Sequence, residues 1–254
     1  MVNYSREKFE NSYKIIYESL TRYMVLQERR CVTFLGGQPG TGKSSFVNQD
    51  YTFSNYIKIN GDDYRKYHPK YKEIISCNIE NMPECTQDFV NECVEKLIRD
   101  LSDDGYNIII EGTLRNSQVT INTCQNLKNK GYITDLYIIS VDAVVSWNST
   151  LNRAEISKNE GGIPRYVPID KYNYIVNNLV SSVKNIEVAK CFDNIYVVNR
   201  NNEILYPRKN SISATAVVNE QLNLSKWNEL FPSLKEKFNN INSDILQYQG
   251  RRGR

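Results

Sequence analysis

A glycine-rich segment that ends in Lys43 and Ser44 carries the clearest chemical signal in the sequence. Residues 37–44 read Gly-Gln-Pro-Gly-Thr-Gly-Lys-Ser, the pattern of a phosphate-binding loop. In such a loop, backbone N–H groups converge on the phosphates, the lysine reaches the β- and γ-phosphates, and the serine hydroxyl ligates magnesium. We therefore predict that ATP and Mg2+ bind here, with Ser44 as the metal ligand. The predicted nucleotide-binding residues are Gly37, Gln38, Pro39, Gly40, Thr41, Gly42, Lys43, Ser44 and Ser45.

Two aspartates, Asp62 and Asp63, follow the short apolar segment 56–59. A carboxylate at the carboxyl end of a strand could accept the proton of a substrate hydroxyl near the γ-phosphate, as a kinase requires. The alternative is that an aspartate in this turn only caps the next helix. We expect Asp62 to take the chemical role and Asp63 to do the capping.

Three further charged residues fit phosphoryl transfer. Glu111 ends the apolar run 106–110, where a carboxylate could organise magnesium or hold a substrate hydroxyl. Arg153 lies on a predicted helix, and Arg165 lies in a loop bounded by Gly161-Gly162 and Pro168. Guanidinium groups on a closing lid can stabilise charge on a transferring phosphoryl group, although exposed arginines are also common without any such role.

Several of these motifs together resemble the zeta toxin family. They are Gly36 to Ser44, the Gly-Asp-Asp-Tyr-Arg segment leading to His68-Pro69, the run from Gly105 through Glu111-Gly112-Thr113-Leu114-Arg115, and Arg153 followed by Arg165. They occur in the family's order between about residues 30 and 200. The resemblance implies ATP-dependent phosphorylation of the 3'-hydroxyl of the amino sugar in UDP-N-acetylglucosamine. It also implies a toxin that blocks bacterial cell-wall synthesis and an epsilon-type antitoxin that covers the nucleotide site.

The resemblance also assigns roles to single residues. It makes Lys43 the phosphate clamp and Asp62 the base, and it places Arg153 and Arg165 over the phosphates. Glu111, Thr113 and Arg115 would contact the sugar nucleotide together with Asp62. The chain departs from the family pattern in two places: Asn60 stands where members often have an aspartate, and the lid region contains the pair Gly161-Gly162. His68 fits the family's His-Pro step, and we interpret it as a structural residue of the loop.

The elements that must position these residues alternate between strands and helices. Apolar strand-like runs are predicted at 31–35, 56–59, 106–110, 133–141 and 194–198, and helical patterns at 4–27, 86–102, 118–130, 144–157 and up to Lys190. This alternation predicts an α/β fold, a P-loop kinase-like, mostly parallel sheet with helices on both faces. We expect a kinase domain at 1–210, including the N-terminal helix, and a helical appendage with a mobile basic tail at 211–254.

Composition narrows the remaining possibilities. The six cysteines show no Cys-x-x-Cys spacing, and we expect reduced thiols in a cytoplasmic protein. The single histidine excludes a multi-histidine metal site, and no apolar run approaches the ~20 residues of a membrane span. A net charge of +3 without a long basic stretch argues against nucleic acid as a partner.

The sequence leaves three alternatives open. A related kinase could act on another nucleotide sugar, an antibiotic or a polynucleotide end. A nucleotide-dependent switch could bind a partner protein without transferring phosphate. No base-reading residue is recognisable, so the choice between ATP and GTP also stays open.

Overall fold

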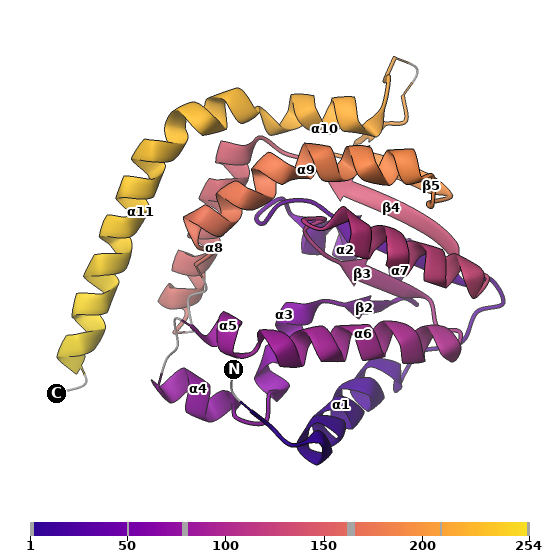
Figure 1. Ribbon diagram of the computed structural model, residues 1–254, viewed down its shortest axis with the longest axis horizontal. Helices are drawn as coiled ribbons and strands as arrows, with labels where there is room; N and C mark the ends of the chain where they lie inside the picture. Colours follow the sequence, from indigo (N-terminus) through magenta and orange to yellow (C-terminus); the bar gives the residue numbers. More distant parts are fainter. Residues whose placement is uncertain (1–2, 50, 78–80, 162–165, 209, 253–254) are drawn as a thin grey trace.

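A six-stranded sheet forms the centre of the computed structural model, which describes residues 3–49, 51–77, 81–161, 166–208 and 210–252 (Figure 1). The strand order is β2-β3-β1-β4-β5-β6. The first five strands run parallel, and β6 pairs antiparallel with β5. The strands are β1 (Cys31–Gly36), β2 (Ile57–Ile59), β3 (Ile108–Glu111), β4 (Ile133–Ile139), β5 (Asn194–Val198) and β6 (Ile204–Tyr206).

Helices connect the parallel strands and cover the sheet (Figure 1). The α-helices are α1 (Arg6–Thr21), α2 (Lys43–Gln49), α3 (Gly61–Tyr64), α4 (Tyr71–Cys77), α5 (Met82–Cys85), α6 (Gln87–Asp103), α7 (Ser117–Asn129), α8 (Ala143–Asn159), α9 (Ile169–Ala189), α10 (Ala214–Leu222) and α11 (Leu224–Arg252). Two short 3-10 helices lie at Tyr51–Phe53 and Arg65–Tyr67. The predicted α/β class is thus confirmed. The edge strand β6 was not predicted, because its three residues are too few to show a pattern.

Strand β1 lies at the middle of the sheet and directs the chain into the phosphate-binding loop. Five of its six residues are buried, which is typical of a parallel strand covered on both faces. Leu35 is in register with Glu111 of β3, so the carboxyl end of β3 lies beside the start of the loop. A Cβ at position 36 would overlap the side chain of Leu114, which would then have to shift.

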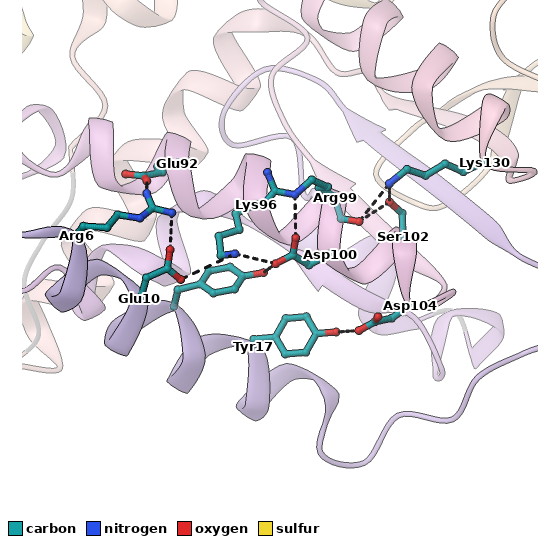
Figure 2. A network of polar contacts seen from close by, with 11 residues as sticks. Arg6, Glu10, Tyr17, Glu92, Lys96, Arg99, Asp100, Ser102, Asp104 and Lys130 are labelled. Carbon is teal, nitrogen blue, oxygen red and sulfur yellow. Dashed lines mark hydrogen bonds and ion pairs between the residues drawn. The ribbon is translucent and has the colours of Figure 1, made fainter.

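The N-terminal helix α1 packs beside α6 (Figure 1). Phe9 and Ile16 are buried in the main core, and Phe9 contacts Phe89 of α6 edge to face. Polar contacts join these two helices (Figure 2). Tyr13 donates a hydrogen bond of 2.8 Å to Asp100, and Tyr17 donates one to Asp104. Helix α1 is therefore fixed to the domain by both packing and directional contacts.

The C-terminal helices build a second, smaller core. Trp227 of α11 is fully buried against Tyr172 of α9, with ring centroids 4.9 Å apart, and against Trp147 of α8 at 6.2 Å. Its indole N–H donates a 2.8 Å hydrogen bond to Asn173. The segment after residue 210 thus shares side-chain packing with the helices of the parallel sheet. Residues 253–254 of the predicted basic tail lie outside the described residues.

No helix among the described residues is both long and apolar enough to cross a bilayer.

Candidate active site

The glycine-rich loop between β1 and α2 has the backbone shape that phosphate binding requires. Gly37, Gly40 and Gly42 have φ values of 135°, 80° and 100°, a region that favours glycine. A Cβ on Gly37 would collide with the carbonyl oxygen of Ile139, and one on Gly40 with that of Ser146. Any larger residue at these two positions would therefore distort the loop. The backbone conformation of the loop is therefore compatible with binding a triphosphate.

Lys43 is buried at the start of α2, and its ammonium folds back onto its own loop. Nζ donates hydrogen bonds of 2.8 Å to the carbonyl of Gly37 and 3.0 Å to that of Gln38. Burial lowers the pKa of Lys43 to about 8, and the charge of Glu111 opposes this shift. The Lys43 ammonium already donates to two carbonyl groups in place of water. Binding of a phosphate would therefore add little to the cost of desolvating this ammonium.

Gln38 ties the phosphate-binding loop to the start of α8, and Thr41 is buried in the same loop. The Gln38 amide donates to the carbonyl of Val141 at 2.7 Å and to the hydroxyl of Ser146 at 3.1 Å. Both Gln38 and Thr41 are fully buried. Within the described ranges, Gln38 Oε1 and Thr41 Oγ1 have no hydrogen-bond partner. The Thr41 hydroxyl is therefore a free donor at the loop, which is consistent with a ligand rich in acceptor oxygens.

Asp62 lies in the first turn of α3, where the side chain of Arg65 holds it. The Arg65 Nε atom lies 2.8 Å from Asp62 Oδ1. Arg65 itself is only 8 % exposed, and its other nitrogens bind the carbonyl of Pro83 and the side chains of Thr86 and Gln87. Because Arg65 is fixed at four points, it fixes one oxygen of the Asp62 carboxylate, whose side chain remains about half-exposed.

The predicted capping role of Asp63 is wrong. Asn60 is the N-cap of α3, and its side-chain oxygen accepts from the backbone N–H of Asp62 at 3.2 Å. Asparagine is among the preferred residues at this position because its oxygen satisfies a helix N–H group. The residue that departs from the family pattern therefore has a local structural role, and neither aspartate is needed as a cap.

Glu111 emerges from β3 with the partner that a buried carboxylate needs. Lys58, on the neighbouring strand β2, forms an ion pair of 2.9 Å with it, and the Glu111 side chain is only 12 % exposed. Glu111 is also the leading charge that raises the pKa of Lys43. Burial has the opposite and larger effect on that lysine. The Glu111 carboxylate is therefore paired with Lys58 and also acts electrostatically on Lys43.

Among the remaining predicted residues, Arg153 lies on α8, and Thr113 and Arg115 follow β3. The charge of Arg153, exposed on α8, lowers the pKa of Lys43, and the charges of Glu111 and Asp62 raise it. Thr113 is partly buried just after β3, and Arg115 is exposed before α7. Arg165 lies outside the described residues. Their roles in binding or catalysis stay predictions.

His68 has the structural environment that was expected for it. It is 3 % exposed, and its ring contacts Tyr4 and Phe89 edge to face. Its Nδ1 atom accepts from the backbone N–H of Lys70 at 3.1 Å. Burial, followed by the charge of Lys70, lowers the pKa of His68. A neutral ring that packs against the segment before α1 and against helix α6 accounts for these contacts.

The described part of the chain holds no group of three or more His, Cys, Asp or Glu side chains arranged for a metal ion. The predicted magnesium ligand Ser44 is exposed near the start of α2. The Ser44 hydroxyl alone would bind Mg2+ only weakly. In nucleotide-binding sites, Mg2+ is usually held by a few protein ligands together with the phosphates of the substrate. The donor set therefore fits a magnesium ion that enters with the nucleotide.

Two arginines with contacts at the site, Arg65 and Arg200, were not predicted from the sequence. Arg65 lies three residues after Asp62, a helical spacing that could have revealed their pairing. Arg200, in the turn between β5 and β6, donates to the carbonyl of Gly40 and to the Ser149 hydroxyl. It thus joins the phosphate-binding loop to α8. No local pattern signals this contact, because Arg200 and Gly40 are 160 residues apart in the sequence.

The family model described as "Zeta toxin" matches residues 16–211. Toxin PezT of Streptococcus pneumoniae serotype 4 is 32 % identical over 234 residues, 90 % of this chain and 91 % of the relative. Toxin zeta of Streptococcus pyogenes is 30 % identical over 241 residues, 92 % of this chain and 84 % of the relative. The similarity therefore extends over nearly the whole sequence, beyond the phosphate-binding loop.

Solved structures agree with this relationship. A chain from the PezAT chromosomal toxin-antitoxin system of Streptococcus pneumoniae superimposes with a TM-score of 0.76 at 32 % identity, covering 94 % of this chain and 96 % of that one. A chain of the AvrRxo1-ORF1:-ORF2 complex shares the fold, with a TM-score of 0.55 at 15 % identity, covering 80 % and 67 % of the two chains. On the family match and the identities to PezT and zeta, this chain belongs to the zeta toxin family.

Proposed function

We propose that the protein is an ATP-dependent phosphotransferase that phosphorylates the 3'-hydroxyl of the amino sugar of UDP-N-acetylglucosamine. The observation that carries this proposal is the position of Asp62. Its carboxylate is oriented by Arg65 at 2.8 Å and lies within electrostatic reach of Lys43 in the phosphate-binding loop. A base beside the γ-phosphate site is what distinguishes transfer to a hydroxyl from nucleotide binding alone.

The proposed reaction gives each of these residues one role. Asp62 accepts the proton of the sugar hydroxyl while the hydroxyl oxygen forms a bond to the γ-phosphorus and the bond to the β-phosphate oxygen breaks. Lys43, Arg153 and Arg165 offset the charge on the transferring group. Magnesium, held in part by Ser44, would neutralise the phosphates. The products are ADP and a sugar nucleotide that carries one more phosphate.

Glu111, Thr113 and Arg115 complete the proposed acceptor side. The ion pair with Lys58 restricts the Glu111 side chain at the end of β3. A restricted carboxylate would orient a sugar hydroxyl at a smaller cost in side-chain entropy. Arg115 is exposed two residues after Thr113, where it could contact an acceptor phosphate. Catalysis would rest mostly on positioning and electrostatics.

A protein inhibitor is part of the proposal. The solved relative comes from a toxin-antitoxin system, and we propose that an epsilon-type antitoxin covers the nucleotide site of this chain in the cytoplasm. The toxin would then be active only after release from the antitoxin. It would block cell-wall synthesis because it converts the sugar nucleotide into a phosphorylated form.

Asp62 and Asp63 offer a matched pair for the test. Purified protein is incubated with ATP, Mg2+ and UDP-N-acetylglucosamine, and the products are weighed by mass spectrometry. The wild type and Asp63→Asn should yield a sugar nucleotide heavier by one phosphate. Asp62→Asn should lower the rate by about 10²- to 10⁴-fold while ATP affinity is retained, as expected for loss of a general base. An inert wild type, or equal rates in the two variants, would refute the proposal.

A further inference from the structure

The turn between β5 and β6, residues 199–203, lies against the phosphate-binding loop. Arg200 donates from Nη2 to the carbonyl of Gly40 and, at 2.8 Å, to the hydroxyl of Ser149 on α8. Asn202 donates at 2.8 Å to the side chain of Gln49, the last residue of α2. The turn therefore contacts both the loop and the helix that follows the loop.

Hydrogen bonds within the turn hold it in this shape. The Asn199 side chain accepts from the backbone N–H groups of Asn201 at 2.9 Å and Glu203 at 3.1 Å, and it donates to the Glu203 carboxylate at 2.6 Å. Asn202 has a φ of 62°, a left-handed conformation that asparagine adopts more readily than most residues. A turn braced in this way can keep Arg200 at a fixed position beside the loop.

The contact of Arg200 with Gly40 fixes the orientation of one peptide plane. A trans peptide is planar, and its C=O and N–H groups point in opposite directions. Because the Gly40 carbonyl faces Arg200, the N–H of Thr41 in the same peptide is directed away from the turn. Glycine restricts the backbone least of all residues, so a peptide plane next to Gly40 needs an external contact to keep one orientation. Arg200 supplies such a contact.

Helix α8 meets the loop at the same place. A Cβ on Gly40 would lie 2.1 Å from the carbonyl oxygen of Ser146, so the loop lies directly on this helix. Ser149, the second acceptor of Arg200, precedes Arg153 by four residues, and the two therefore share a face of α8. Arg200 thus fixes the loop relative to the helix face that carries Arg153.

We propose that Arg200 is a positioning residue of the phosphate-binding loop. By holding the Gly40 carbonyl, it directs the Thr41 N–H toward the phosphates of a bound triphosphate, and it does so without touching the nucleotide. Loops of this type bind phosphates through converging backbone N–H groups. The inference rests on the part of the proposed function that places a triphosphate in this loop. It adds the β5–β6 turn to the parts of the chain that set affinity for the phosphate donor.

Inorganic tripolyphosphate separates this role from a contact with the nucleotide base, because it carries phosphates and no base. Isothermal titration calorimetry measures the binding of tripolyphosphate and of a non-hydrolysable ATP analogue, each with Mg2+. Arg200→Met removes both hydrogen bonds, and Arg200→Lys keeps the positive charge. Arg208→Met is the matched control, because Arg208 donates to the carbonyl of Ile204 in its own segment. Urea unfolding checks that the variants remain as stable as the wild type.

Arg200→Met should weaken binding of both ligands about tenfold, as expected when one hydrogen bond to a charged group is misdirected. Arg200→Lys should recover part of this loss, and Arg208→Met should match the wild type. The loss should persist at high salt, because salt screens long-range charge and leaves the shape of the loop unchanged. Failure of the wild type to bind tripolyphosphate, a loss confined to the ATP analogue, or a loss that salt abolishes would overturn the proposal.

Ser149→Ala is a second, smaller change at the same contact. It removes one acceptor of Arg200 and leaves the guanidinium charge in place. It should weaken both ligands less than Arg200→Met does. Added to Arg200→Met, it should cause no further loss, because the two residues act through one contact. Additive losses would show that they act separately and would contradict the proposal.

Turnover separates this inference from the proposed function. If the wild type and Arg200→Met phosphorylate UDP-N-acetylglucosamine with the same KM for ATP, the reaction stands and the role of Arg200 is wrong. If phosphate binding depends on Arg200 but no phosphorylated sugar nucleotide forms, the role of Arg200 stands and the proposed reaction is wrong.

Discussion

The buried ammonium of Lys43 predicts that nucleotide binding takes up a proton at alkaline pH. In the free protein its pKa falls from 10.5 to about 8, chiefly through burial. This fall corresponds to about 3 kcal/mol of bias against the charged form. Anionic phosphates should reverse the bias, because an opposite charge within a few ångströms favours the ammonium. Binding should therefore return Lys43 to its protonated form.

The expected magnitude follows from the titration curve. With a pKa of about 8, Lys43 is neutral in about nine of ten free molecules at pH 9 and in about one of ten at pH 7. Uptake on binding should therefore be about 0.9 proton at pH 9 and about 0.1 at pH 7. A terminal phosphate titrates near pH 6, so the nucleotide's own ionisation contributes little at either value.

Calorimetry in buffers of different ionisation enthalpy measures this uptake directly. A non-hydrolysable ATP analogue with Mg2+ is the ligand, and adenosine, which lacks phosphates, is the control that should show no pH-dependent uptake. Equal uptake at pH 7 and pH 9 would refute the reasoning. The same shift has a consequence for folding: the unfolded chain binds more protons between about pH 8 and pH 10.5, so this group makes the free protein more stable as pH rises through that window.

Three further predictions concern backbone, packing and positioning. Gly40→Ala should abolish nucleotide binding in a filter assay because of the strained φ and the collision with a carbonyl, whereas Gly131→Ala, also at positive φ but in open space, should still bind. Trp227→Ala should lower the free energy of unfolding in urea by about 3–5 kcal/mol, and the 85 % exposed Tyr23 should tolerate alanine; equal effects would contradict the packing argument. Arg65→Met should lower kcat more than tenfold at unchanged KM for ATP, because the base loses its fixed orientation; an unchanged kcat would contradict it.

The sequence predicted the framework of the site well, because the framework depends on local patterns. The glycines of residues 37–44 require particular backbone angles, and the five apolar runs became the parallel strands in which Leu35 and Glu111 lie in register. Asp62 and Glu111 could be placed at one edge of the sheet by the rule that carboxyl ends of parallel strands meet.

What could not be predicted depends on contacts between distant segments. The ion pair of Lys58 with Glu111 requires the order β2-β3, and the contact of Arg200 with Gly40 requires the turn after β5 to reach the loop. The cap of α3 was misassigned because Asn60, Asp62 and Asp63 are all good capping residues, and only the backbone decides which one precedes the helix.

The burial of Trp227 links the end of the chain to its beginning. Trp227 packs on Tyr172, the hydroxyls of Tyr172 and Ser146 lie 2.5 Å apart, and Ser146 accepts from Gln38 in the phosphate-binding loop. A chain without α11 would keep the described residues of the proposed catalytic centre but would lose the packing behind Tyr172 and Ser146. We therefore expect loss of the Trp227 side chain to loosen the phosphate-binding loop as well as the C-terminal core.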